Sequence, residues 1–71
     1  MINPNIVKSI KEMIESAEEN LVRNRENLAN NPDSLFYMGM VKNSTEYIEE
    51  LTELLDNYLT KGKEDVSNNN I

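Results

Sequence analysis

Apolar residues recur along the chain at spacings of three and four, in two separate stretches that are each interrupted by a polar residue. These spacings are the a and d positions of a heptad repeat, which form one continuous stripe on an α-helix. The pattern therefore predicts two amphipathic helices, each with one stripe turned toward a neighbour. The stripes are Val7, Ile10, Ile14, Ala17, Leu21, Asn24 and Leu28, and then Tyr37, Val41, Ser44, Ile48, Leu51, Leu55 and Tyr58.

Asparagine, proline and glycine mark where these helices begin and end. Asn3-Pro4 and Asn31-Pro32 each offer an asparagine as N-cap and a proline at the first helical position. The N–H that proline lacks would have no hydrogen-bond partner within the helix at that position. Gly62, between two lysines, is typical of a helix C-terminus. We therefore expect helices over about 4–30 and about 32–61, a hairpin domain over 1–62, and a flexible polar tail over 63–71.

A joint this short places the two helices antiparallel, so the expected fold class is an all-α, antiparallel two-helix hairpin. Equal rise per residue, counted outward from a break at Asn30-Asn31, sets which stripe positions face each other. Asn24 is expected to meet Tyr37 and to fix the register through a hydrogen bond. The other expected pairs are Ile10 with Leu51, Ile14 with Ile48, Ala17 with Ser44, and Leu21 with Val41.

Each stripe is wider than a two-helix seam requires. Ile6 and Met13 widen the first stripe, and Met40, Tyr47 and Leu54 widen the second. A third apolar position per heptad indicates that each helix contacts more than one neighbour, as in a bundle. The simplest completion is a homodimer that forms a four-helix bundle, and the helices of a partner protein are the alternative. The residues expected to self-associate are Val7, Ile10, Met13, Ile14, Leu21, Met40, Val41, Tyr47, Ile48, Leu51, Leu54, Leu55 and Tyr58.

The composition favours self-association and excludes several kinds of functional site. A chain of 71 residues makes one small domain, which is marginally stable without disulfides, a metal or self-association. The sequence has no cysteine and no histidine, which excludes disulfides and zinc sites built on these residues. No cofactor, metal ligand or catalytic residue is expected, and we expect a protein that is not an enzyme. No apolar run is long enough to span a bilayer and no signal peptide is visible, so we expect a cytoplasmic protein without a membrane partner.

The charge is strongly acidic, with 13 Asp and Glu against 7 Lys and Arg and a net charge of −6. Nucleic-acid phosphates would repel such a protein, so direct binding to nucleic acid is not expected, whereas a protein partner with a basic surface is allowed. Glutamates from both helices fall at one level in the middle of the hairpin. They are either a solvated exterior or a docking surface. The candidate partner-binding residues in this acidic band are Glu12, Glu15, Glu19, Glu46, Glu49 and Glu50.

Three short patterns resemble known families of helical proteins. The stretch from Tyr37-Met38-Gly39-Met40 through Glu46-Tyr47 to Leu54-Leu55 resembles the second helices of small phage-encoded hairpin proteins, which implies an accessory or host-directed role. Glu15-x-x-Glu18 and Glu53-x-x-Asp56 resemble the carboxylate pattern of the MazG-like nucleotide pyrophosphohydrolases, which implies a magnesium-dependent helical dimer. The hairpin also resembles the Spo0E-like aspartyl-phosphate phosphatases, but Ile48-Glu49-Glu50-Leu51-Thr52 lacks the serine and the aspartate of their Ser-x-x-Leu-Asp motif.

The leading interpretation is a small acidic interaction module that self-associates and binds a protein partner, which it modulates or inhibits. The resemblance to phage hairpin proteins implies that it is encoded by a phage or a mobile element. One alternative is an acidic mimic of DNA that occupies the basic groove of a nucleic-acid-binding protein. The other alternative is a MazG-like, metal-dependent nucleotide hydrolase.

Overall fold

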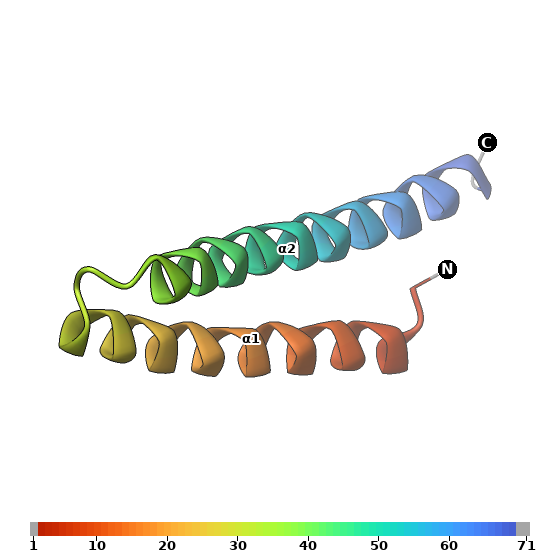
Figure 1. Ribbon diagram of the computed structural model, residues 1–71. Coiled ribbons are helices and arrows are strands. Elements are labelled where there is room, and N and C mark those ends of the chain that lie inside the picture. The colour runs from red at the N-terminus through yellow and green to blue at the C-terminus, as the bar shows by residue number, and fades with distance from the viewer. Residues whose placement is uncertain (1, 70–71) are drawn as a thin grey trace.

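The computed structural model describes residues 2–69, and the side chains of residues 2–62, as two helices packed side by side in a hairpin (Figure 1). Helix α1 spans Pro4–Asn30 and helix α2 spans Leu35–Asn69. The rod that they form has extents of 58 × 17 × 11 Å. The expected all-α hairpin is confirmed. Neither helix, over the residues described, combines the length and the apolar character that a membrane span needs.

Helix α1 begins and ends on asparagine caps. The Asn3 side chain accepts a hydrogen bond from the backbone N–H of Asn5 at 2.9 Å, and Pro4 occupies the first turn. At the other end the backbone N–H of Asn31 donates to the carbonyl oxygen of Asn27, and the Asn31 side-chain amide donates to the same oxygen at 3.0 Å. The bounds of α1 coincide with the expected range of 4–30.

Helix α2 begins at Leu35, whereas the sequence predicted a start near residue 32. Residues 31–34 form a turn, and Ser34 is the residue that caps the helix. Its hydroxyl accepts a hydrogen bond from the backbone N–H of Tyr37 at 3.2 Å, and its carbonyl oxygen accepts one from Met38 at 3.1 Å. Serine is as good an N-cap as asparagine, so two capping signals compete here and the later one prevails.

Helix α2 also continues past Gly62, where the sequence predicted its end, and runs to Asn69. The backbone of Gly62 is right-handed helical and does not take the left-handed conformation of a glycine C-cap. The predicted tail over 63–71 is therefore helical in its backbone up to residue 69, its flexibility stays a prediction, and residues 70–71 lie outside the described part of the chain.

Gly62 is instead the place where the N-terminal segment packs against α2. It is buried, and the Ile2 side chain lies so close that a Cβ built on Gly62 would overlap Ile2 Cγ1. Next to this contact the backbone N–H of Asn3 donates to the Tyr58 hydroxyl at 2.8 Å. The glycine thus provides space for a side chain at the open end of the hairpin, opposite the joint.

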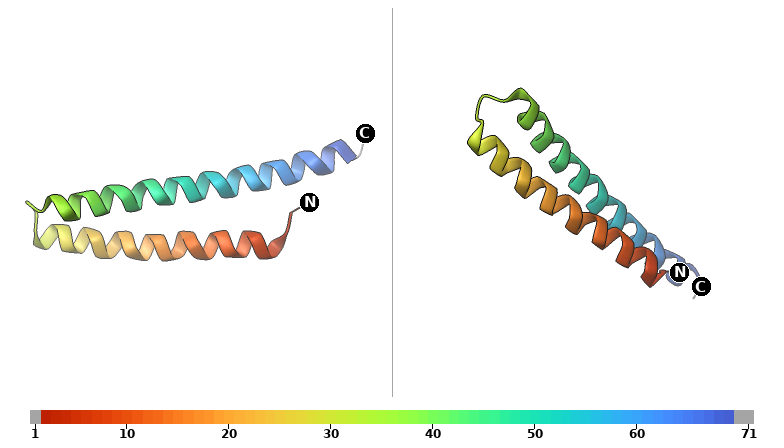
Figure 2. Two further views of the ribbon diagram at one scale, coloured as in Figure 1. Left: turned by 45° about the vertical axis from the view of Figure 1, so that its right-hand side comes forward. Right: turned by 60° about the horizontal axis from the view of Figure 1, so that its bottom comes forward.

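The predicted stripes form the seam between the helices, and Figure 2 shows from two directions that the helices stay side by side along α1. Three seam residues, Ile10, Ala17 and Leu51, are only 4–7% exposed. The other eleven stripe positions are half-buried. The apolar core is therefore one layer of side chains, since one face of each helix is covered and the rest is not.

One polar pair crosses this seam. The Asn24 side-chain amide donates a hydrogen bond to the Ser44 hydroxyl at 2.9 Å, and both residues are half-buried. The sequence predicted a polar partner for Asn24 but named Tyr37. The identity of that partner was wrong.

The longer turn accounts for part of this difference. The expected register was counted from a break at Asn30-Asn31, but α2 starts only at Leu35. At equal rise per residue, this longer turn moves the facing α2 position by about three residues, whereas Ser44 stands seven residues beyond Tyr37. At the open end, the contact between Ile2 and Gly62 agrees with a shift of about three residues, whereas the hydrogen bond between Asn3 and Tyr58 has the register first expected. The other four expected pairs stay predictions, namely Ile10 with Leu51, Ile14 with Ile48, Ala17 with Ser44, and Leu21 with Val41.

Alanine in place of each glycine should separate their roles. Both glycines lie inside α2, where alanine is favoured by about 1 kcal/mol. A Cβ at Gly39 would meet nothing within 4 Å, so Gly39→Ala should raise the melting temperature. Gly62→Ala displaces Ile2 and should melt below Gly39→Ala. Thermal unfolding followed by circular dichroism measures both variants, and adding Ile2→Ala to Gly62→Ala is the control, because it removes the overlapping side chain. Equal gains from the two single substitutions would contradict the packing of Ile2 on Gly62.

A double-mutant cycle should detect the hydrogen bond across the seam. Asn24→Ala and Ser44→Ala should each lower the free energy of unfolding, with a coupling of about 0.5–1.5 kcal/mol, the net contribution of a typical hydrogen bond. Urea denaturation at one fixed protein concentration measures the coupling. The cycle of Asn24→Ala with Tyr37→Phe is the control and should show no coupling. Coupling found only in the control would restore the register counted from the break at Asn30-Asn31.

Candidate interaction surfaces

One side of the seam carries exposed apolar side chains from both helices. They stand seven residues apart on each helix and directly precede an a position, so each set lines one edge of its stripe. In an antiparallel pair the two edges fall on the same side of the seam. We call this surface the apolar flank. Its members, which are 38–52% exposed, are Ile6 and Met13 of α1 and Met40, Tyr47 and Leu54 of α2.

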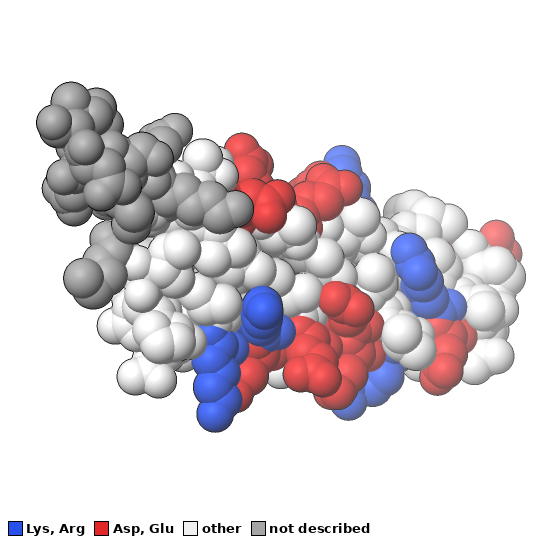
Figure 3. Space-filling model, turned by 180° about the vertical axis from the view of Figure 1, so that it is seen from behind, with Lys and Arg blue, Asp and Glu red and all other residues white. Residues whose placement is uncertain are grey.

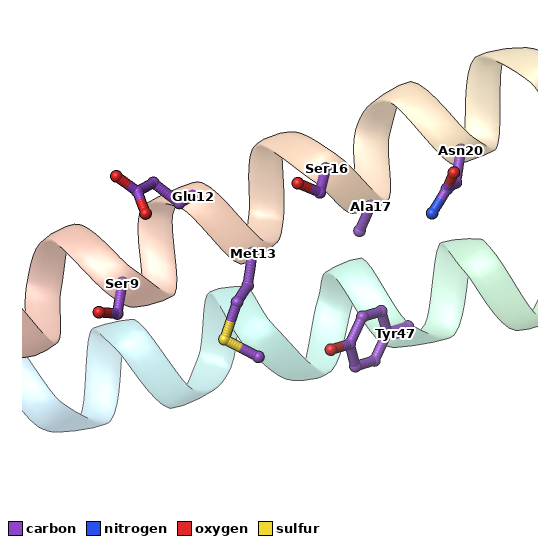
Figure 4. A pocket seen from close by; sticks show the side chains of 7 residues that line it. All are labelled: Ser9, Glu12, Met13, Ser16, Ala17, Asn20 and Tyr47. Atoms are coloured by element: carbon purple, nitrogen blue, oxygen red, sulfur yellow. The ribbon is translucent and has the colours of Figure 1, made fainter.

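A groove of about 480 Å³ hollows the apolar flank (Figure 4). Its shape follows from the small side chains on α1, where buried Ala17 forms the floor. Met13 reaches from α1 toward α2 above this floor, and Tyr47 lies along α2 beside it. The residues that line the groove are Ser9, Glu12, Met13, Ser16, Ala17, Asn20 and Tyr47. The apolar flank is therefore not flat, and a protruding side chain could enter it.

The polar groups of the groove suit hydrogen bonding. They are three hydroxyl groups, one amide and the Glu12 carboxylate, which lies 4.0 Å from the Lys8 ammonium group and is largely exposed. Hydroxyl and amide groups both donate and accept hydrogen bonds. Such a lining accepts a polar tip on an otherwise apolar side chain.

The carboxylates of the pyrophosphohydrolase-like pattern are all exposed. Among the described residues, no group of three acidic side chains lies close enough together to hold a metal ion. The magnesium site that this resemblance implies is therefore not formed by the described part of a single copy. The four residues concerned are Glu15, Glu18, Glu53 and Asp56.

The acidic band lies on the outer surfaces of both helices. Its six glutamates are exposed, because they occupy heptad positions other than a and d. Figure 3 shows carboxylates gathered along the middle of the rod, on both sides of an uncharged band. Of the six, Glu12 also lines the groove. The acidic band thus points away from the seam, and five of its six members also stand apart from the groove.

The joint end of the hairpin carries a second group of exposed apolar residues, which the sequence-based prediction missed. Leu35 and Phe36 are 81% and 69% exposed, and Val22 and Met38 are also exposed. The Phe36 ring packs edge-on against the Tyr37 ring, with 5.4 Å between the ring centroids. All four exposed residues stand off the a and d stripe. The sequence does indicate them, because they are large apolar residues that stand outside the a and d positions of the repeat.

Comparisons with protein-family models, with curated proteins and with solved structures found no match to this chain. The interpretation of these surfaces therefore rests on their own geometry and chemistry. Three features carry it, namely the apolar flank, the groove and the acidic band.

Proposed function

We propose that this protein is a non-enzymatic interaction module that self-associates into a four-helix bundle and binds a basic surface on a protein partner. The apolar flank is the observation that carries the proposal. Five large apolar side chains from both helices remain exposed there, whereas three apolar side chains are buried among residues 2–62. The molecule thus exposes more large apolar groups on one side than it buries in its own seam, and such a surface marks an interaction site.

The energetics of a two-helix hairpin support self-association. Ordering the backbone costs about 1–2 kcal/mol per residue, and each Å² of apolar surface buried returns only about 25 cal/mol. With a single layer of half-buried side chains, the net free energy of folding is near zero for so short a chain. Covering the apolar flank with a second copy buries further area without ordering more backbone in either copy. Association therefore shifts the balance toward the folded state.

The acidic band is available to a partner when the apolar flank is covered, since most of its glutamates lie on outer positions. A dense group of carboxylates accelerates encounter with a basic protein surface through long-range attraction. Inhibition follows where the partner uses that same basic surface for its own ligand. The acidic band therefore raises the rate of association and also makes the protein prefer a basic partner.

A mimic of DNA is the form of this proposal in which the basic surface belongs to a nucleic-acid-binding protein. Figure 3 shows carboxylates on both sides of an uncharged band, with Lys and Arg side chains among them. The carboxylates on the two sides favour this candidate, because DNA also carries two rows of negative charge. Competition between the protein and duplex DNA for the recovered partner distinguishes it from the general proposal.

Self-association should appear in the mass of the purified protein. Sedimentation equilibrium at micromolar concentration should give a dimer or a larger assembly and not the monomer mass of 8.2 kDa. Tyr47→Ser combined with Leu54→Ser removes apolar area from the flank and should shift the mass toward the monomer. The matched control is Leu35→Ser combined with Phe36→Ser at the joint end, which should leave the mass unchanged. A monomeric parent protein with a sharp thermal transition would overturn the self-association.

Loss of two charges from the acidic band should weaken partner binding without harming the fold. Glu15→Gln combined with Glu49→Gln relieves repulsion between like charges, so the melting temperature should rise slightly. Recovery of the partner from a host lysate by the immobilised variant, quantified by mass spectrometry, should fall at low salt. The matched control, Glu26→Gln combined with Asp33→Asn, removes the same charge outside the band and should bind like the parent.

Salt should affect the two associations in opposite directions. Binding to a basic partner should weaken as salt rises, because screening reduces attraction between opposite charges. Dimerisation of two acidic copies should strengthen, because screening reduces their repulsion. Partner recovery that is equal for the parent and the band variant at low salt would exclude the acidic band from binding.

A further inference from the structure

We infer that the second copy on the apolar flank lies antiparallel to the first, so that the joint of each hairpin packs beside the open end of the other. This inference rests on the self-association proposed above and adds its geometry. A two-fold axis in the plane of the interface can run along the rod or across it. An axis along the rod puts both joints at the same end, and an axis across it puts them at opposite ends.

Charge is distributed unequally along the rod. Residues 20–45, the joint half, hold three cations and two carboxylates, which gives a net charge of +1. Residues 2–19 together with 46–62, the open half, hold three lysines and nine carboxylates, which gives a net charge of −6. The charged residues of the joint half are Arg23, Arg25, Lys42, Glu26 and Asp33.

This asymmetry distinguishes the two arrangements. With both joints at the same end, one open half stacks on the other and two groups of −6 repel each other. With the joints at opposite ends, each open half stacks on a joint half of +1, so the two open halves stand apart and the net repulsion between the copies is smaller. Packed helices stand about 8–10 Å apart, and the screening length at physiological salt is about 8 Å. Screening therefore weakens the preference for opposite ends but does not reverse it.

The flank residues of α2 fit the same arrangement. Met40, Tyr47 and Leu54 are spaced seven residues apart, about 10.5 Å per step along the helix. A two-fold axis across the rod at the level of Tyr47 places Tyr47 beside its own copy and Met40 beside Leu54 of the second copy. Because Tyr47 lines the groove, this axis also brings the second tyrosine to the mouth of the groove. Its hydroxyl then meets a lining that can donate and accept hydrogen bonds.

The alternative arrangement makes different contacts. With both joints at the same end, α2 of one copy lies over α1 of the other. Leu54 then approaches Met13 of the second copy, whereas Met40 and Leu54 of different copies stand about fourteen residues, or about 21 Å, apart. Each arrangement therefore brings together a pair of residues that the other keeps apart.

Cysteine cross-linking distinguishes these pairs without background, because the natural sequence has no cysteine. A disulfide forms only where the two Cα atoms come within about 7 Å. The single variants Met40→Cys, Leu54→Cys, Met13→Cys and Tyr47→Cys are oxidised alone and as mixed pairs at low salt. Cross-linked dimers are then quantified on non-reducing gels and identified by mass spectrometry.

The antiparallel dimer predicts two results. Met40→Cys should link to Leu54→Cys at several times the yield of Met13→Cys with Leu54→Cys, and Tyr47→Cys should link to itself. A preference of Leu54→Cys for Met13→Cys, or a dimer without the link between positions 40 and 54, would overturn the orientation and leave self-association standing. A protein that is monomeric by sedimentation and forms no link would overturn both proposals. Leu35→Cys, at the joint end and off the flank, is the control and should link to none of the four.

Discussion

Burial of one apolar stripe on each helix is the interaction on which this molecule depends. The stripes meet along a single seam, and the residues that stand at a and d positions on α1 and α2 account for the most buried apolar side chains, Ile10, Ala17 and Leu51. Because a seam covers only one face of a helix, the residues at its edges are left partly open. Each helix has three apolar positions per heptad, but the seam of a two-helix hairpin covers only two of them. The third position remains exposed and forms the apolar flank.

The heptad pattern predicted the seam well because packing of a two-helix hairpin depends mainly on periodicity. It predicted the joint less well, because Asn31-Pro32 and Ser34 are both good helix starts and nothing local decides between them. The start at Ser34 lengthens the turn, and Asn24 bonds to Ser44 and not to Tyr37 as predicted.

Other features depend on contacts that no local pattern carries. Gly62 has the sequence context of a helix end, yet it lies inside α2, where Ile2, sixty residues away, packs against it. Leu35 and Phe36 were missed for the opposite reason, since a search for periodic stripes disregards apolar residues that stand out of phase. The candidate surfaces divide in the same way. The flank could be predicted from periodicity, whereas the groove depends on how α1 and α2 are positioned across the seam.

The thin seam also bears on how long the protein lasts. A chain whose folded state depends on covering its flank has a folded fraction that rises with its own concentration. Proteases act on the unfolded fraction, so copies made in small numbers are degraded faster than copies made in large numbers. If the proposed bundle forms, turnover would fall steeply once the concentration of the protein exceeds the dissociation constant of the bundle. Such a protein carries its own abundance threshold, below which it is cleared and above which it accumulates.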